Sequence, residues 1–193
     1  MLSGQKIKQV LSSSELEFAG LVRGNSLLLT LGNELQEFVE DPNLVIEPWS
    51  RSSVNAGYTV ARTDWQTYDL LPGRGVLVAA REFLRLPKEL AGIIGTLSHL
   101  ARLGLFAHYA SPHIGPRFSG YICLELLNVS GHIVRLRQAM PVAKVVLVRV
   151  EGTDPEDGPS SIPFFYNTTS GLRRDLRSRF FEEFGKELFD END

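Results

Sequence analysis

Residues 121–130 read YICLELLNVS, and residues 144–150 read KVVLVRV. Both runs are short, rich in isoleucine, valine and leucine, and bounded by glycine, serine or proline, which is the pattern of buried strands. Because such strands recur along the chain between frequent turns, the sequence predicts a mainly β domain, either a barrel or a sandwich.

The stretch before these strands supports the same class. Residues 70–87, LLPGRGVLVAAREFLRLP, predict a turn at Pro72-Gly73 and a buried strand from Val76 to Ala80, with a neighbouring strand that stops at Pro87. KELAGIIG, residues 88–95, predicts another strand preceded by a turn.

The N-terminal part predicts a helix followed by strands. Ser3 is placed to cap a short amphipathic helix whose apolar residues are Ile7, Val10 and Leu11, ending at residues 12–14. Residues 25–39, NSLLLTLGNELQEFV, favour two short strands around a turn at Gly32-Asn33. Residues 41–69 show no strong period and predict loops with strands.

The composition shifts after Gly152. Residues 151–163, EGTDPEDGPSSIP, indicate an exposed linker, and residues 172–189 have helical spacing of leucine and phenylalanine. We therefore expect a barrel domain over residues 1–152, and a linker with a C-terminal helical tail over residues 153–193.

Bulk composition excludes several classes of protein. The 193 residues suit one folded domain, with 43% hydrophobic and 22% charged residues. A net charge of -3 gives no general attraction for a nucleic acid polymer or an anionic membrane. Cys123 is the only cysteine, which excludes an internal disulfide and a zinc site of several thiolates. With no signal-like apolar core and no long apolar run, we expect a cytoplasmic protein.

Common cofactor motifs are missing. The chain has no G-x-x-x-x-G-K-[ST] loop, no G-x-G-x-x-G after a strand, and no H-x-E with P-C-x-x-C of zinc deaminases. Its four histidines do not have the spacing of a metal site on one helix. We expect no metal site and no intrinsic cofactor.

Glu125 stands out because the rest of its predicted strand is almost entirely apolar. It is either an outward-facing glutamate on a strand with one solvated face or a carboxyl group whose surroundings suit proton transfer. In the second case it could take a proton from water and pass it to a leaving amine.

Residues 97–105, LSHLARLGL, add polar groups to an apolar run. Arg102 could pair with a carboxylate or bind phosphate, or be a surface arginine. Ser98 could orient water or be a turn serine, and His99 could simply face solvent. His108 and His113 flank a loop where a recognition role and a structural role are equally open.

An ordered set of motifs over residues 71–150 resembles the dCTP deaminase and dUTPase superfamily. SHLARLGL is similar to the family's S-S-L-A-R-L-G-L, and residues 113–128, HIGPRFSGYICLELLN, to its I-D-P-G-[WF]-x-G-x-[IL]-x-L-E-x-x-N. Residues 136–147, LRQAMPVAKVVL, are similar to L-x-P-G-M-x-I-[AG]-Q. The N-terminal helix and SLLLTLGNELQEF also resemble the family's opening segments.

The resemblance implies a distorted jelly-roll β barrel of the dUTPase-like type that forms a homotrimer with active sites between subunits. It implies deamination of a cytosine deoxynucleotide without a catalytic metal, in which Glu125 activates water while Ser98 and Arg102 position it and stabilise charge. Magnesium would enter only as carried by a nucleoside triphosphate. Substrate-binding roles fall on the following residues: His99, Ser111, His113, Ile114, Tyr166, Arg173 and Arg174.

The departures from the family pattern concern ligand binding. Leu97 replaces an arginine and His99 a serine, both of which help to hold triphosphate, and Leu28 replaces an early aspartate. Gly115 replaces the aspartate that meets the sugar and, in the triphosphatase branch, positions water. The leading hypothesis is a dCTP deaminase-like enzyme. The alternative is a non-catalytic trimeric nucleotide-binding or regulatory relative, and dUTP hydrolysis ranks last.

Overall fold

A computed structural model describes residues 1–13, 16–47, 51–109 and 111–152 of the chain. The predicted linker and helical tail lie outside these residues, as do Tyr166, Arg173 and Arg174. Within the described ranges, the three helices are too short and too polar to span a bilayer.

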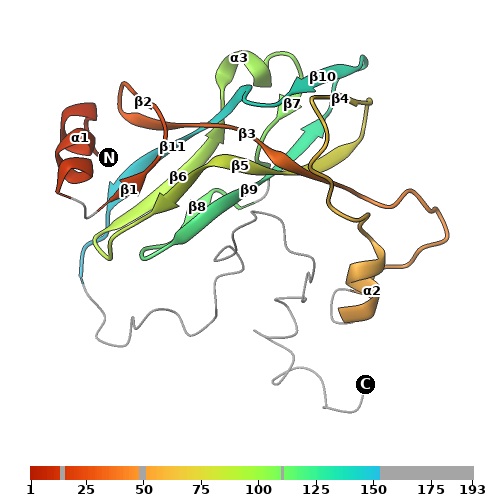
Figure 1. The fold of residues 1–193 in the computed structure, drawn as a ribbon, viewed down its shortest axis with the longest axis horizontal. Helices are drawn as coiled ribbons and strands as arrows, with labels where there is room; N and C mark the ends of the chain where they lie inside the picture. The colour runs from red at the N-terminus through yellow and green to blue at the C-terminus, as the bar shows by residue number, and fades with distance from the viewer. Residues whose placement is uncertain (14–15, 48–50, 110, 153–193) are drawn as a thin grey trace, which may run out of the picture.

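The fold is mainly β, as the sequence predicts, and its principal sheet is antiparallel and curled. The strands run in the order β7-β9-β5-β3-β11-β6-β8, with β1 paired to β5 and β2 to β3. The bounds are β1 Glu17–Phe18, β2 Val22–Arg23, β3 Ser26–Glu37, β5 Gly75–Arg85, β6 Leu90–Thr96, β7 Leu105–Phe106, β8 His113–Ile114, β9 Ser119–Asn128 and β11 Pro141–Arg149. Figure 1 shows this arrangement.

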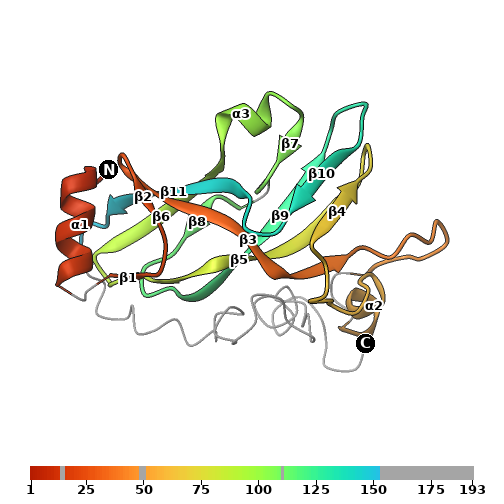
Figure 2. The ribbon, with the colours of Figure 1, turned by 45° about the horizontal axis from the view of Figure 1, so that its top comes forward.

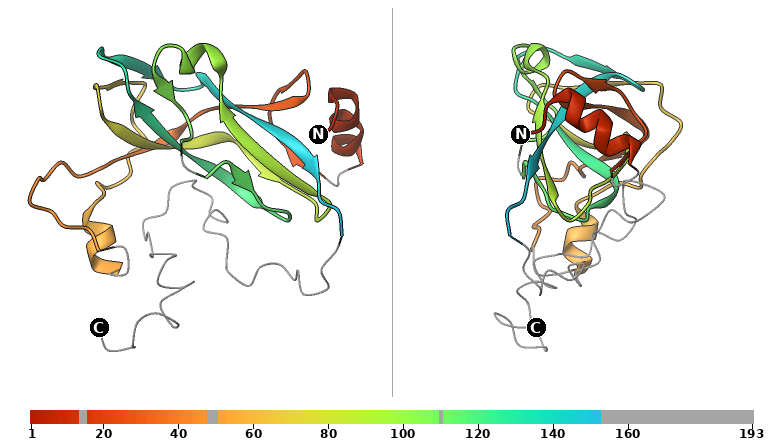
Figure 3. Two further views of the ribbon diagram at one scale, coloured as in Figure 1. Left: turned by 180° about the vertical axis from the view of Figure 1, so that it is seen from behind. Right: turned by 90° about the vertical axis from the view of Figure 1, so that its left-hand side faces the viewer.

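The sheet forms a curled half-barrel with smaller elements at its ends. β4 (Thr67–Leu70) and β10 (Val134–Arg137) make a separate two-stranded ribbon, visible beside β9 in Figure 2. The views in Figure 3 show the strands curving around one interior, with α1 at one end. In the described part of the chain the strand order is an open path, so the complete jelly-roll barrel stays a prediction.

The N-terminal helix α1 (Gly4–Ser12) forms as its cap and spacing predict. The Ser3 hydroxyl accepts a hydrogen bond from the Lys6 backbone N–H at 3.3 Å, which satisfies one of the free donors of the first turn. Ile7 is fully buried, so the helix attaches to the end of the sheet through its apolar side.

The prediction of two short strands around Gly32-Asn33 is wrong, because β3 is one strand of 12 residues. Its register against β5 shifts between Leu31 and Leu35, so a β-bulge absorbs the Gly-Asn pair without a chain reversal. A Cβ atom on Gly32 would lie 2.6 Å from the Ala79 carbonyl oxygen. The glycine therefore permits two strands to approach closely and does not mark a hairpin.

The other predicted strands form at the expected places. Gly73 adopts a φ of 73° in the turn before β5, and the Leu90 N–H bonds the Pro87 carbonyl in the turn before β6. β5 continues past Ala80 to Arg85 through a register shift against β9, so the strand and its expected neighbour are one element. The unpatterned stretch 41–69 contains α2 (Arg51–Ala56), which lies away from the sheet in Figure 1.

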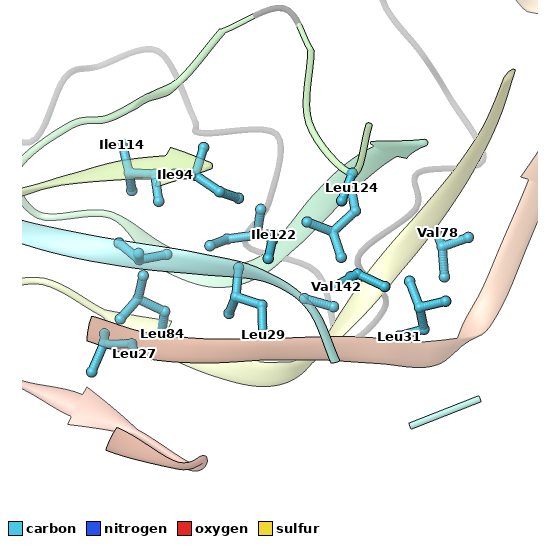
Figure 4. Close-up of a cluster of buried hydrophobic side chains, with 14 of the residues drawn as sticks. Leu27, Leu29, Leu31, Val78, Leu84, Ile94, Ile114, Ile122, Leu124 and Val142 are labelled. Carbon is cyan, nitrogen blue, oxygen red and sulfur yellow. The ribbon is translucent and has the colours of Figure 1, made fainter. Parts of the chain in front are cut away.

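Alternation along β9 determines which side chains enter the core. Ile122, Leu124 and Leu126 are buried, with exposed fractions of 5%, 0% and 0%. They pack with leucines of β3 and with β5, β6 and β11 residues, as Figure 4 shows. The intervening residues Tyr121, Cys123 and Glu125 therefore lie on the opposite, outer face of the sheet.

Candidate functional site

Glu125 lies on the outer face of β9, but this face is not simply solvated. Its cross-strand neighbour is Leu77 of β5, and the next pair on the same face is Cys123 with Ala79. The side chain of Glu125 is partly buried, and its Oε2 atom is buried with no hydrogen-bond partner among the described residues. The interpretation of Glu125 as an outward-facing glutamate is correct for its direction but not for its surroundings, because one carboxylate oxygen is buried. The proposed role in proton transfer stays a prediction.

A small apolar cluster covers this part of the outer face. Leu77 and Ala79 are buried there beneath Phe38, Tyr58, Ala61 and Cys123. The Phe38 and Tyr58 rings lie 5.2 Å apart between centroids, and their backbones form an antiparallel bridge. The segment after β3 thus returns across the sheet and places aromatic groups beside the strand position of Glu125.

The titratable groups in and near this cluster shift one another's pKa values. Burial raises the pKa of Tyr58, and the Cys123, Tyr109 and Glu125 charges raise it further. Burial, followed by the charge of Glu125, raises the pKa of Tyr109 and brings that of the Cys123 thiol to about 12. The phenols and the thiol therefore stay protonated at neutral pH, and Cys123 is no nucleophile.

The polar residues of the LSHLARLGL stretch occupy a different setting. α3 (Ser98–Ala101) begins after Leu97, whose side chain packs against the core and gives no side-chain cap. Ser98, His99 and Arg102 are exposed. No hydrogen bond or ion pair joins Ser98 or Arg102 to Glu125 in the described part of the chain. Direct bonds within the described residues therefore do not link the three predicted catalytic residues.

α3 is nevertheless attached to the end of β9. β7 follows α3 and pairs with β9, with Leu105 opposite Asn128, and the Val129 N–H bonds the Gly104 carbonyl at 2.8 Å. The fully buried Asn128 donates through Nδ2 to the carbonyls of Leu70 and His132, at 2.9 Å and 2.8 Å. The asparagine of the L-E-x-x-N motif thus holds the turns at this end of the sheet.

Three predicted substrate-binding residues lie close together in the middle of the chain: Ser111 in the loop before β8, and His113 and Ile114, which form β8. The His108 Nε2 atom contacts the Ser111 carbonyl, whereas Ser111 and His113 are exposed. Ile114 packs in the core, as Figure 4 shows, so any substrate contact at this position would come from its backbone. The Ser111 and His113 side chains are accessible to a ligand, whereas the Ile114 side chain is not. The binding roles of these residues stay predictions.

Among the described residues, two that are not glycine have positive φ, and both stand where the family motifs have glycine. Arg117, at φ 62°, stands at the glycine of I-D-P-G, and Ala139, at φ 60°, at the glycine of P-G-M. A left-handed conformation costs an L-residue about 1–2 kcal/mol relative to glycine. The chain keeps the family's backbone turns at these places although the side chains have changed.

Three surface hollows of the described residues have linings that do not include the predicted catalytic residues. One of about 460 Å³ lies at the bulges of β3 and β5 and is lined in part by Asn33, Arg81 and Tyr121. Within the described residues, no three histidine, cysteine, aspartate or glutamate side chains cluster as metal ligands. The candidate site is therefore the covered carboxylate of Glu125 together with the exposed group on α3.

Sequence reasoning missed Tyr58. It lies in the unpatterned stretch 41–69, far from Glu125 along the chain, and becomes its neighbour only because Phe38 and Tyr58 bridge across the outer face. No local motif marks it. Only knowledge of the chain's return over β5 could have identified it.

Comparison with known proteins agrees with the motifs. Residues 1–150 match the family described as dCTP deaminase-like. A protein named dCTP deaminase, dUMP-forming, from Methanoregula boonei is 34% identical over 131 residues, covering 68% of this chain and 70% of that protein. The protein of the same name from Mycolicibacterium vanbaalenii is 32% identical over 166 residues, covering 86% of each chain.

The fold has a counterpart among solved structures. The crystal structure of 2′-deoxycytidine 5′-triphosphate deaminase from Agrobacterium tumefaciens superposes with a TM-score of 0.59 at 17% sequence identity. The match covers 77% of this chain and 48% of that one, so the present chain spans about half of its length. With the match over residues 1–150, these findings lead to one conclusion: the chain belongs to the dCTP deaminase-like family.

Proposed function

We propose that the protein catalyses the hydrolytic deamination of a cytosine deoxynucleotide, dCTP to dUTP and ammonia, without a catalytic metal. The observation that carries the proposal is the Glu125 carboxylate, whose Oε2 atom is buried without a hydrogen-bond partner in the described structure. A buried acceptor with no structural partner is costly to stability, and such costs concentrate at functional sites. Membership of the dCTP deaminase-like family supports the same reading.

The chemistry follows from the residue types. Glu125 accepts a proton from water as the water oxygen bonds to C4 of the cytosine ring. The carboxyl group then passes that proton to the exocyclic nitrogen, the C4–N bond breaks, and ammonia leaves. The Ser98 hydroxyl orients the water, and the Arg102 guanidinium stabilises negative charge that develops on the base.

No hydrogen bond or ion pair joins these groups among the described residues, which is compatible with an active site between chains. Ser98 begins α3 and Arg102 directly follows it, and both are exposed, whereas Glu125 lies on the outer face of β9. We propose a homotrimer in which α3 of one subunit meets β9 of the next, so that each site takes residues from two copies. Magnesium belongs to the substrate in this scheme, as a counterion of the triphosphate.

The product proposed is dUTP. Formation of dUMP from dCTP, as the names of the relatives state it, requires a second hydrolysis at the phosphates, which needs its own positioned water. Gly115 offers no carboxylate to position it, and Leu97 packs on the core where the family pattern has a phosphate-binding arginine. We accordingly rank dUTP hydrolysis last.

The same departures favour one alternative, a trimeric relative that binds nucleotides without turnover. It predicts that calorimetric titration with cytosine and uracil nucleotides gives binding heat while no ammonia forms. If the protein neither binds these nucleotides nor forms ammonia, both the proposal and this alternative are wrong.

The decisive experiment measures ammonia and pyrophosphate released from dCTP, dCMP and deoxycytidine. The wild-type protein should release ammonia from at least one of them, and Glu125→Gln should lose this activity by about 10²–10⁴-fold. Glu17→Gln, at an exposed glutamate paired with Arg85, is the matched control and should retain it. Equal ammonia release by Glu125→Gln would contradict the proposal, and pyrophosphate from dCTP would overturn the dUTP assignment.

A further inference from the structure

The position of Tyr58 is fixed by backbone pairing on both of its sides. The Thr59 N–H donates to the Glu37 carbonyl at 2.9 Å, and the Val39 N–H donates to the Gly57 carbonyl at 2.8 Å. The Thr59 hydroxyl also bonds the Glu37 carbonyl, at 3.2 Å. These bonds continue the ladder of β3 and hold the Tyr58 ring against the outer-face cluster beside Glu125.

The hydroxyl of Tyr58 has no hydrogen-bond partner among the described residues. Tyr68 is a useful contrast, because its hydroxyl donates to the Glu37 carboxylate at 2.9 Å. Near Tyr58 the available acceptor is Glu125, whose Oε2 atom is itself buried and unpartnered. The Tyr58 ring packs on the cluster of Leu77 and Ala79, and Leu77 is the cross-strand neighbour of Glu125, so the phenol and the carboxylate belong to one patch of the outer face.

The two groups lie within electrostatic reach. Burial is the main reason that the pKa of Tyr58 is raised, and the charges of Cys123, Tyr109 and Glu125 contribute in that order. A phenol with a raised pKa keeps its proton at neutral pH and can act only as a donor or as a neutral acceptor. A small group that accepts from the phenol and donates to the carboxylate would give each of them a partner.

We propose, on the basis of the deaminase function above, that Tyr58 is a further catalytic residue that orients the attacking water. Its hydroxyl donates a hydrogen bond to the water oxygen, and the water donates a hydrogen bond to the Glu125 carboxylate. This arrangement fixes the oxygen lone pair that attacks C4 and complements the role of Ser98 from the other side of the site.

The step balances without a further reagent. One water proton moves to Glu125 as the C4–O bond forms, and the same proton later moves to the departing nitrogen, which keeps the electron pair of the C4–N bond. The second water proton moves from O4 to N3 after ammonia leaves, and this gives the C4 carbonyl of uracil. Tyr58 keeps its proton throughout and follows the oxygen from water to the tetrahedral adduct, where the hydrogen bond stabilises the new C–O group. The raised pKa of the phenol suits a donor that is never ionised.

The test is Tyr58→Phe, which removes the hydroxyl and keeps the ring. We expect kcat for ammonia release to fall by about 10–100-fold while KM changes by less than about threefold, because the base still stacks and binds. Tyr121→Phe is the matched control, since Tyr121 lies on the same face of β9 farther from Glu125, with its ring against Phe83. It should keep the wild-type kcat. A kcat for Tyr58→Phe within twofold of wild type would overturn the proposal.

A second measurement tests the proximity of the two groups without using activity. In protein labelled at the tyrosine ζ-carbon, the Tyr58 signal is assigned by its absence in Tyr58→Phe and followed against pH. Glu125→Gln should lower the titration midpoint of Tyr58, because a nearby negative charge no longer opposes phenolate formation. An unchanged midpoint would overturn the proposal even if Glu125→Gln is inactive. Absence of turnover by the wild-type protein would instead overturn the proposed function itself, and this role with it.

Discussion

β9 and α3 hold the two halves of the candidate site in opposite environments. On β9 a carboxylate oxygen is buried among aromatic and apolar side chains and accepts no hydrogen bond from the described residues. On α3 a serine and an arginine are exposed to water, with no partner among those residues. The Glu125 carboxylate therefore has no cation beside it, and the Arg102 guanidinium has no carboxylate beside it, among the described residues.

The difference indicates that neither half is complete within one chain. A buried carboxylate gains most from a cation that reaches it in low dielectric, whereas an exposed arginine gains little from distant charges. Bringing α3 of a second copy against β9 would satisfy both groups at once. The predictions below test whether these two regions act as one site.

After Glu125→Gln, the largest effect should come from Arg102→Ala. Because Arg102 is exposed, its removal should leave the free energy of unfolding within about 0.5 kcal/mol of wild type. The loss of its charge at the reacting base should lower kcat for ammonia release by about 10²–10³-fold. Arg23→Ala, at an exposed arginine of β2, serves as the control for loss of surface charge. Wild-type turnover by Arg102→Ala would show that Arg102 takes no part in the chemistry at Glu125.

Mixing two inactive variants tests whether one site spans two subunits. Glu125→Gln supplies an intact α3, and Arg102→Ala supplies an intact β9. In randomly mixed trimers roughly a quarter of the sites would receive one intact half from each partner. Ammonia release should therefore recover to roughly a quarter of the wild-type rate after the two are unfolded and refolded together, but not when each is refolded alone. No recovery in a confirmed mixed oligomer would place each site within one chain.

Leu97→Arg probes the boundary between the exposed and packed sides of α3. The Leu97 side chain packs against the core, so replacing it should lower the free energy of unfolding by about 1–2 kcal/mol. The new guanidinium stands where the family pattern has a phosphate-binding arginine, so KM for dCTP should fall relative to KM for dCMP. Ser98→Ala, one residue along, is the stability control and should cost less. Equal KM changes for both nucleotides would show that this position does not meet phosphate.

The local parts of this fold could be predicted because local physics decides them. Ser3 caps α1, and the apolar residues of β9 alternate with the outer-face residues as a strand requires. Gly32 misled the prediction because a glycine in a strand pattern can mark a turn or a close approach of two backbones. Only the position of the Ala79 carbonyl distinguishes the two, and that contact comes from a distant strand.

The candidate site was predictable only in its residue types. Motif order identified Glu125, Ser98 and Arg102, but no pattern in the sequence shows that Glu125 is covered or that Tyr58 approaches it. That contact depends on the bridge between Phe38 and Tyr58, which joins segments on either side of an unpatterned loop. Long-range pairing of this kind is set by tertiary packing rather than by local propensity.

The smallest expected effect lies outside both halves of the site, at Ala139. This residue has a φ of 60° before β11, so Ala139→Gly removes left-handed strain while adding flexibility to the unfolded chain. We expect the free energy of unfolding in urea to rise by about 0.5–1 kcal/mol.

The same substitution at Ala143 gives the matched control. Ala143 is fully buried within β11 and has no positive φ, so Ala143→Gly gains no relief of strain and loses packing and chain stiffness. Its free energy of unfolding should fall by about 1 kcal/mol. If both substitutions destabilise the protein equally, the backbone at Ala139 carries no strain that glycine relieves, and the turn is held by its hydrogen bonds, among them the 2.8 Å bond from the Ala139 N–H to the Leu31 carbonyl. Unchanged ammonia release by Ala139→Gly would further show that stability in this turn is separable from chemistry at β9 and α3.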